Sequence, residues 1–142
     1  MKPTYVIGAV LFASGLVAVG IGGSILLVPE AFYASYGIDL SGNINLLNEM
    51  RASGGSLLAC GILILSGTFV ARFAWPAALV GCLTFIPFGL SRGLAILLDG
   101  APASGLVLSA WIELAIGAAC LMVLLRDRDD GQSRTAFGST GA

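Results

Sequence analysis

Two charged residues, Arg92 and Glu113, each stand alone inside a long apolar segment, where they could form an ion pair or part of a binding site. A charged side chain within hydrocarbon is costly, so it usually faces the protein interior and has a partner. As helices rising 1.5 Å per residue, the segments place Arg92 and Glu113 roughly 9 and 10 Å from the ends that one short connection joins. Equal depth and opposite sign predict an ion pair.

Three further charged residues lie near the same ends of the apolar segments. Glu49 and Arg51 precede the second segment and point about 200° apart around a helix, so they reach different neighbours. Asp99 follows Arg92 by two helical turns and is a second candidate partner nearer the surface. Together they predict an outer layer of ionisable residues in a bundle whose inner half has none: Glu49, Arg51, Arg92, Asp99 and Glu113.

Three interpretations of this polar layer are open. The charges could fix helix register and rotation, which is a structural role. They could form an outward-facing pocket for a small anion, a lipid headgroup or a quinone-like molecule. A proton relay through Glu113 is disfavoured, because no acidic residue continues the path inward. Pro87 removes the helical donor for the carbonyl of Leu83, so it is either a hinge beside this layer or a static kink.

Composition excludes most catalytic chemistry. There is no histidine, so His-based acid–base catalysis and most catalytic zinc sites are excluded. Cys60, Cys82 and Cys120 stand on three different segments without a C-x-x-C pair, which is typical of small apolar filling residues. Net charge −1 and no basic stripe argue against nucleic-acid binding. We expect no metal, no cofactor and no enzymatic activity.

The elements that position these residues are four apolar segments, each about long enough to span a bilayer as a helix. Only 11% of the 142 residues are charged and 57% are apolar. Short links predict antiparallel neighbours, hence an all-α, up-down-up-down, four-helix transmembrane bundle over residues 1–125. The predicted spans cover residues 6–28, 52–70, 74–98 and 106–125. An outer connection, 29–51, begins with an interfacial helix over 29–36 that Gly37 ends, and residues 126–142 form a disordered tail.

The distribution of Lys and Arg predicts the orientation. If the N-terminus is cytoplasmic, one basic residue, Arg51, lies outside, and five lie inside: Lys2, Arg72, Arg126, Arg128 and Arg134. We therefore expect both termini in the cytoplasm of a multi-pass protein of the bacterial inner membrane. The first segment is longer than the apolar core of a cleaved signal peptide, which favours its retention as a span.

Several short motifs together resemble a bacterial family of small four-helix membrane proteins of unknown function, related to the DoxX-like group. They are Pro29-Glu-x-Phe32, Tyr36-Gly37, Asn48-Glu-Met-Arg-Ala-Ser-Gly-Gly55, Gly89-Leu-Ser-Arg-Gly93, Leu98-Asp-Gly-x-Pro102 and Glu113-Leu-x-x-Gly117. The resemblance covers roughly residues 5–126. It implies the same four-span bundle and polar layer, and no assigned activity. The wider group is linked to redox and thiol-stress systems, but the lack of C-x-x-C argues against transferring that link.

These observations favour a non-catalytic accessory or assembly subunit that packs against a larger inner-membrane complex. Ser14, Ala18 and Gly22 recur every four residues on the first segment and offer a face for helix contacts. The expected partners are the lipid bilayer and either a membrane protein or further copies of the chain. The alternative is a binder or carrier of a small lipophilic or anionic ligand, such as a bound lipid or quinone, in the outer polar pocket.

Overall fold

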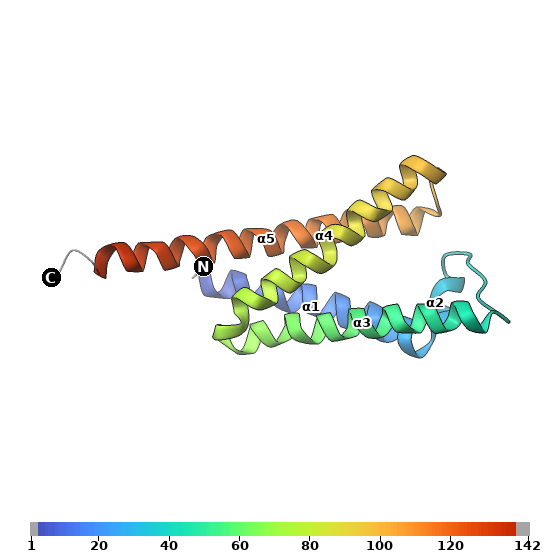
Figure 1. Ribbon diagram of the computed structural model, residues 1–142, viewed down its shortest axis with the longest axis horizontal. Coiled ribbons are helices and arrows are strands. Elements are labelled where there is room, and N and C mark those ends of the chain that lie inside the picture. Colours follow the sequence, from blue (N-terminus) through green and yellow to red (C-terminus); the bar gives the residue numbers. More distant parts are fainter. Residues whose placement is uncertain (1–2, 139–142) are drawn as a thin grey trace.

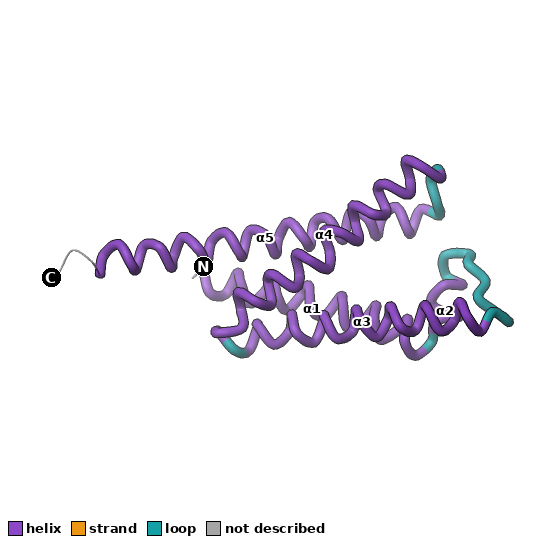
Figure 2. Tube along the Cα trace, viewed as in Figure 1, coloured by secondary structure: helices purple, strands orange, loops and turns teal. Residues whose placement is uncertain are grey.

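The computed structural model describes residues 3–138, with side chains described for residues 5–126. In this part of the chain, helices are joined by turns and loops without any strand (Figure 2). The elements are α1 (Pro3–Leu27), α2 (Pro29–Ala34), α3 (Ile44–Phe69), the 3-10 turn η1 (Ala71–Phe73), α4 (Ala74–Asp99) and α5 (Ser104–Gly138). Among the described residues, α1, α3, α4 and α5 are long and apolar enough to cross a membrane. The predicted all-α bundle of four spans is confirmed.

Consecutive spans run in opposite directions, and the two chain ends lie at the same end of the bundle (Figure 1). The short turn η1 joins α3 to α4, and residues 100–103 join α4 to α5. The most extensive contacts are between α1 and α3 and between α4 and α5, and α3 packs against α4 to connect these two pairs. The bundle is therefore two antiparallel helix pairs, α1/α3 and α4/α5, which diverge toward the end that carries α2 (Figure 1).

Glycine allows α1 and α3 to approach backbone to backbone. A Cβ added at Gly61 would lie 2.6 Å from the backbone nitrogen of Val19, and one added at Gly54 would lie 2.7 Å from that of Leu26. Small residues drive such close packing in membranes, where burial from lipid supplies no hydrophobic gain. Ser14 and Ala18 are also buried. The small-residue stripe, expected to receive a partner protein, is thus used inside the chain.

The short helix predicted over residues 29–36 is observed as α2, which ends two residues earlier, at Ala34. Pro29 occupies its first turn, and Gly37, with φ of 76°, ends the turn that follows. Span α3 begins at Ile44 rather than at Ala52, because the Asn43 side chain accepts a hydrogen bond from the Leu46 backbone N–H at 3.0 Å. This N-cap starts the helix well before the apolar run, at residues that sequence hydropathy assigns to the loop.

The C-terminal segment differs from the sequence expectation. The backbone of α5 is helical through Gly138, so residues 126–138, predicted to be disordered, continue the fourth span as helix. A helix already nucleated in the bundle can propagate one residue at a time without a new nucleus. Residues 139–142, the rest of the predicted tail, lie outside the described residues.

Candidate functional site

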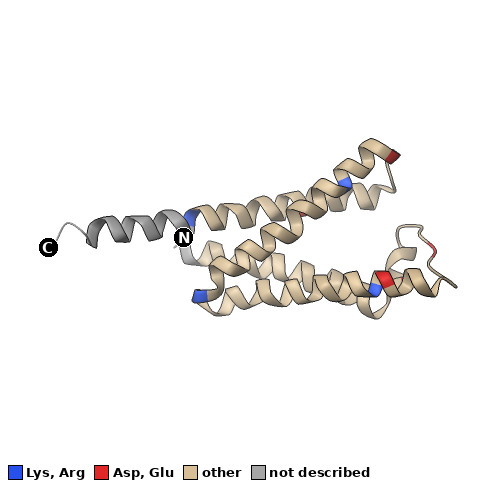
Figure 3. Cartoon of the chain, in the orientation of Figure 1, with Lys and Arg blue, Asp and Glu red and all other residues tan. Residues whose placement is uncertain are grey.

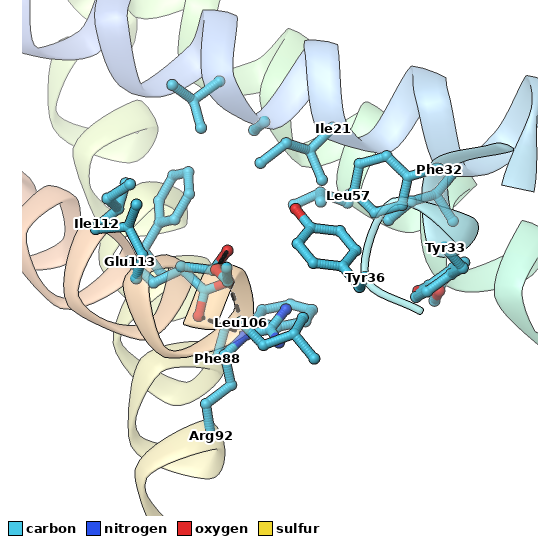
Figure 4. A pocket seen from close by; sticks show the side chains of 18 of the residues that line it. Ile21, Phe32, Tyr33, Tyr36, Leu57, Phe88, Arg92, Leu106, Ile112 and Glu113 are labelled. Atoms are coloured by element: carbon cyan, nitrogen blue, oxygen red, sulfur yellow. Dashed lines mark hydrogen bonds and ion pairs between the residues drawn. The ribbon is translucent and has the colours of Figure 1, made fainter. Parts of the chain in front are cut away.

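A cavity of about 590 Å³ lies between the two helix pairs at the end that carries α2. All four spans and α2 contribute to its wall, and the contributing side chains are mainly apolar or aromatic (Figure 4). Arg92 and Glu113 are the two charged residues among them. Other residues in the wall are Ile21 from α1, Phe32, Tyr33 and Tyr36 from α2 and the turn that follows it, Phe85 and Phe88 from α4, and Leu108, Ser109 and Ile112 from α5.

Arg92 and Glu113 form the predicted ion pair across the α4–α5 interface. The Arg92 Nε donates to both carboxylate oxygens of Glu113, at 3.1 Å to Oε1 and 3.0 Å to Oε2. The Arg92 side chain is 35% exposed and that of Glu113 only 13% exposed. In the hydrogen bonds of the described residues, Arg92 uses only Nε. Its two Nη groups are therefore left to donate to a molecule in the cavity.

Glycines hold α4 and α5 close enough for this pair to form. Gly89 is buried, and a Cβ there would lie 2.7 Å from the Leu114 side chain and 3.2 Å from the Ala110 carbonyl oxygen. On α5, a Cβ at Gly117 would lie 3.1 Å from the backbone nitrogen of Ile86. Gly93, four residues after Gly89 on α4, has open space instead. One glycine per helix therefore sets the interaxial distance near the ion pair.

An aromatic cap, formed by Phe32, Tyr33 and Tyr36, covers the cavity at the α2 end. The Phe32 ring packs edge-on against Tyr33 and Tyr36, with centroids 5.3 and 5.5 Å away. The Tyr36 ring also rests on the start of α5, where a Cβ at Gly105 would lie 3.0 Å from it. Burial raises the pKa of the Tyr33 hydroxyl, an effect that the nearby positive charge of Arg92 partly offsets. The cap thus brings neutral phenols toward the ion pair.

The sequence does not predict that these three rings line a cavity. Their role depends on α2 folding back over the bundle, toward the start of α5. The available signal is the pair Pro29 and Gly37, which marks a short helix and a sharp reversal after it. That signal predicts the turn but not the partner on which the rings pack.

Of the five charges predicted to form one polar layer, the structure brings only Arg92 and Glu113 into contact. Arg51 donates instead to the backbone carbonyl of Leu26, and approaches that of Leu27 at 3.5 Å. It thereby satisfies carbonyls at the C-terminal end of α1, which lack helical donors. Glu49 and Asp99 are exposed, and neither forms an ion pair with the described residues. The acidic residues visible in Figure 3 lie toward the end of the bundle that carries α2.

Pro87 and the cysteines occupy positions consistent with structural roles. Pro87 is exposed on α4, between the cavity residues Phe85 and Phe88, and the helix continues through it. Cys82 and Cys120 are buried and Cys60 is half-buried, and all three are free thiols. Whether Pro87 acts as a hinge stays a prediction.

The comparisons with known proteins agree with this architecture without adding an activity. Residues 6–124 match the family described as a domain of unknown function, DUF4345. The chain therefore belongs to the DUF4345 family. No curated protein and no solved structure matches it significantly. The relation to the DoxX-like group inferred from short motifs stays a prediction.

Proposed function

We propose that this multi-pass membrane protein binds a small lipophilic molecule in the cavity between the α1/α3 and α4/α5 pairs, without catalysing a reaction on it. The observation that carries the proposal is the combination, in one cavity, of an apolar wall, a single Arg92–Glu113 ion pair and an aromatic cap. This is the second of the two functions that the sequence favours, and the geometry raises it above the first.

The size and lining of the cavity fit a small ligand. Its volume of about 590 Å³ falls within the roughly 300–1,000 Å³ typical of small-molecule sites, which combine apolar walls with a few polar groups. Three wall residues, Ile21 on α1 and Leu108 and Ile112 on α5, are substantially exposed, and both helices are apolar and long enough to cross a membrane. An apolar cavity wall on such helices favours a ligand dissolved in the bilayer.

One of the grounds for the accessory-subunit function is weakened. The small-residue face on α1 is not available to a partner protein, because Ser14, Ala18 and Gly22 are buried within the chain. The exposed apolar side chains on the spans are what any lipid-facing surface requires.

The test is to identify what the protein retains through purification in a mild detergent. Organic extraction and mass spectrometry of the wild type should reveal a lipophilic molecule in near-stoichiometric amount. Ile21→Trp adds bulk at the cavity wall and should abolish retention. Leu16→Trp is the matched control, because Leu16 is also exposed on α1 but does not line the cavity. Equal retention by both variants would contradict the proposal, and a stoichiometric protein partner in place of a ligand would favour the accessory role.

A further inference from the structure

We infer that the ligand carries an uncharged hydrogen-bond-accepting head group, such as an ester, ketone or amide carbonyl, on an apolar tail. The inference rests on the proposed function and specifies the class of molecule that the cavity accepts. Arg92 without Glu113 would favour an anionic head group, and the inference excludes this class of ligand.

The cavity carries no net charge. Its two charged side chains, Arg92 and Glu113, neutralise each other through contacts of 3.0–3.1 Å. An anionic head group would make the cavity net negative in a medium of low dielectric, where an uncompensated charge is strongly disfavoured. A cationic head group would place a second positive charge beside Arg92. An uncharged head group leaves the pair balanced.

The polar side chains that line the cavity supply hydrogen-bond donors. Both Nη groups of Arg92 lack a protein partner among the hydrogen bonds of the described residues, and guanidinium groups only donate. Ser109 does not add a free donor, because its hydroxyl donates to the Gly105 carbonyl at 3.0 Å. The Tyr33 and Tyr36 hydroxyls of the aromatic cap can donate as well. A complementary head group must therefore accept hydrogen bonds.

The apolar wall of the cavity includes exposed side chains beside the ion pair. Ile21 on α1 and Leu108 and Ile112 on α5 line the cavity and are substantially exposed. The ion pair lies on α4 and α5, with Arg92 roughly 10 Å from the end of α4 and Glu113 roughly 14 Å from the start of α5 at 1.5 Å per residue. A membrane-dissolved molecule can thus place its head group at the pair while its tail lies along these apolar side chains.

The test uses probes that share a dodecyl chain and differ only in the head group. Methyl dodecanoate, dodecanoate and dodecyltrimethylammonium are titrated into the full-length protein in a nonionic detergent, and bound probe is counted by native mass spectrometry. Binding to Ile21→Trp is subtracted as detergent background. We expect the wild type to bind the ester about tenfold or more tightly than either charged probe, since a buried unpaired charge costs at least this factor.

Glu113→Gln supplies the decisive comparison. Removing the carboxylate leaves Arg92 uncompensated, so the preference should reverse and dodecanoate should bind about tenfold or more tightly than the ester. Glu49→Gln, an exposed carboxylate at the same end of the bundle, should keep the wild-type preference. If Glu113→Gln does not fold, the double variant Arg92→Gln/Glu113→Gln keeps the cavity neutral and should still prefer the ester.

The outcomes separate the inference from the proposed function. If the wild type binds dodecanoate as tightly as the ester, or more tightly, the inference is overturned while the binding function stands. The same holds if Glu113→Gln keeps the ester preference, or if the neutral double variant prefers dodecanoate. If none of the three probes binds above the Ile21→Trp background, and the purified protein retains no lipophilic molecule, the proposed function itself fails.

Discussion

The Nε of Arg92 on α4 lies 3.1 and 3.0 Å from the two carboxylate oxygens of Glu113 on α5, at the wall of an apolar cavity. This contact joins the two helices where the bundle diverges, and it is the polar centre of the candidate site. Because it uses only one of the three guanidinium nitrogens, it leaves donors for a ligand while cancelling the charge. Structural and binding roles are therefore compatible in the same pair.

The ion pair should contribute measurably to stability. Arg92→Ala and Glu113→Ala should each lower the free energy of unfolding by about 1–3 kcal/mol, because each leaves a partner with unmet hydrogen-bonding needs. The lower part of this range applies to Glu113→Ala, because the Arg92 that it leaves unpaired is 35% exposed and solvent screens its charge, whereas Arg92→Ala leaves the 13% exposed Glu113 carboxylate unpaired. Detergent-micelle unfolding of the two single variants and the double variant gives the coupling energy.

The charge swap Arg92→Glu/Glu113→Arg is the control for this pairing. It should recover part of the stability lost in the single variants, because the attraction is restored across the same interface. Two results together would show that the two groups do not stabilise each other. The losses in free energy of unfolding of the single variants would add up to that of the double variant, and the swap would be no more stable than either single variant.

The close approach of α1 and α3 should depend on glycine at the interface. Gly61→Ala should lower the free energy of unfolding by about 1–3 kcal/mol, because the added Cβ would lie 2.6 Å from the Val19 backbone nitrogen and must push the helices apart. Gly20→Ala is the matched control, since a Cβ there meets nothing within 4 Å. It should be neutral or stabilise α1 by up to about 1 kcal/mol through helix propensity. Equal effects of the two changes would contradict the packing.

Pro87 should behave as a static kink. Pro87→Ala supplies an N–H for the carbonyl of Leu83 and should raise the free energy of unfolding by about 1–3 kcal/mol. If the kink does not move, methyl dodecanoate should dissociate from Pro87→Ala at a rate within about twofold of the wild-type rate. The rate is measured by exchange of bound labelled ester against unlabelled ester. A much slower dissociation would instead identify Pro87 as a hinge that opens the cavity.

The orientation of the bundle is a prediction from its basic residues. With Lys2, Arg72 and Arg126 at one end, the termini should face the cytoplasm. In a bacterial host, a C-terminal green fluorescent protein fusion should fluoresce, and a C-terminal alkaline phosphatase fusion should be inactive. A phosphatase fusion after Gly42, in the outer connection, should be active. The opposite pattern would place the α2 end and its cavity on the cytoplasmic side.

The sequence predicts the spans and the central ion pair because both depend on quantities visible along the chain. Hydropathy sets span length, and counting residues sets the equal depth of Arg92 and Glu113. The hydrogen-bond partner of Arg51 cannot be predicted from such counts, because it is a backbone carbonyl at the end of α1. Only the packing of α1 on α3 brings this carbonyl within reach of Arg51.

The cavity itself also depends on features that spacing does not report. The small residues of α1 are equally suited to internal and external helix contacts, so Ser14 and Ala18 do not reveal that α3 covers them. The position of Tyr36 against Gly105 requires the loop after α2 to direct the ring across the bundle to α5. The burial of the α1 small residues and the position of Tyr36 both depend on how the helices pack against one another in three dimensions.

Photo-crosslinking tests the central claim most directly. A dodecyl ester probe with a diazirine beside its carbonyl is photolysed with the wild-type protein in detergent, and the labelled peptides are identified by mass spectrometry. The account predicts labelling of the α4 and α5 segments around Arg92 and Glu113 and of the aromatic cap at Tyr36, with loss of this labelling in Ile21→Trp and not in Leu16→Trp. Labelling confined to lipid-facing residues away from the cavity, such as Leu83 and Met122, would contradict it.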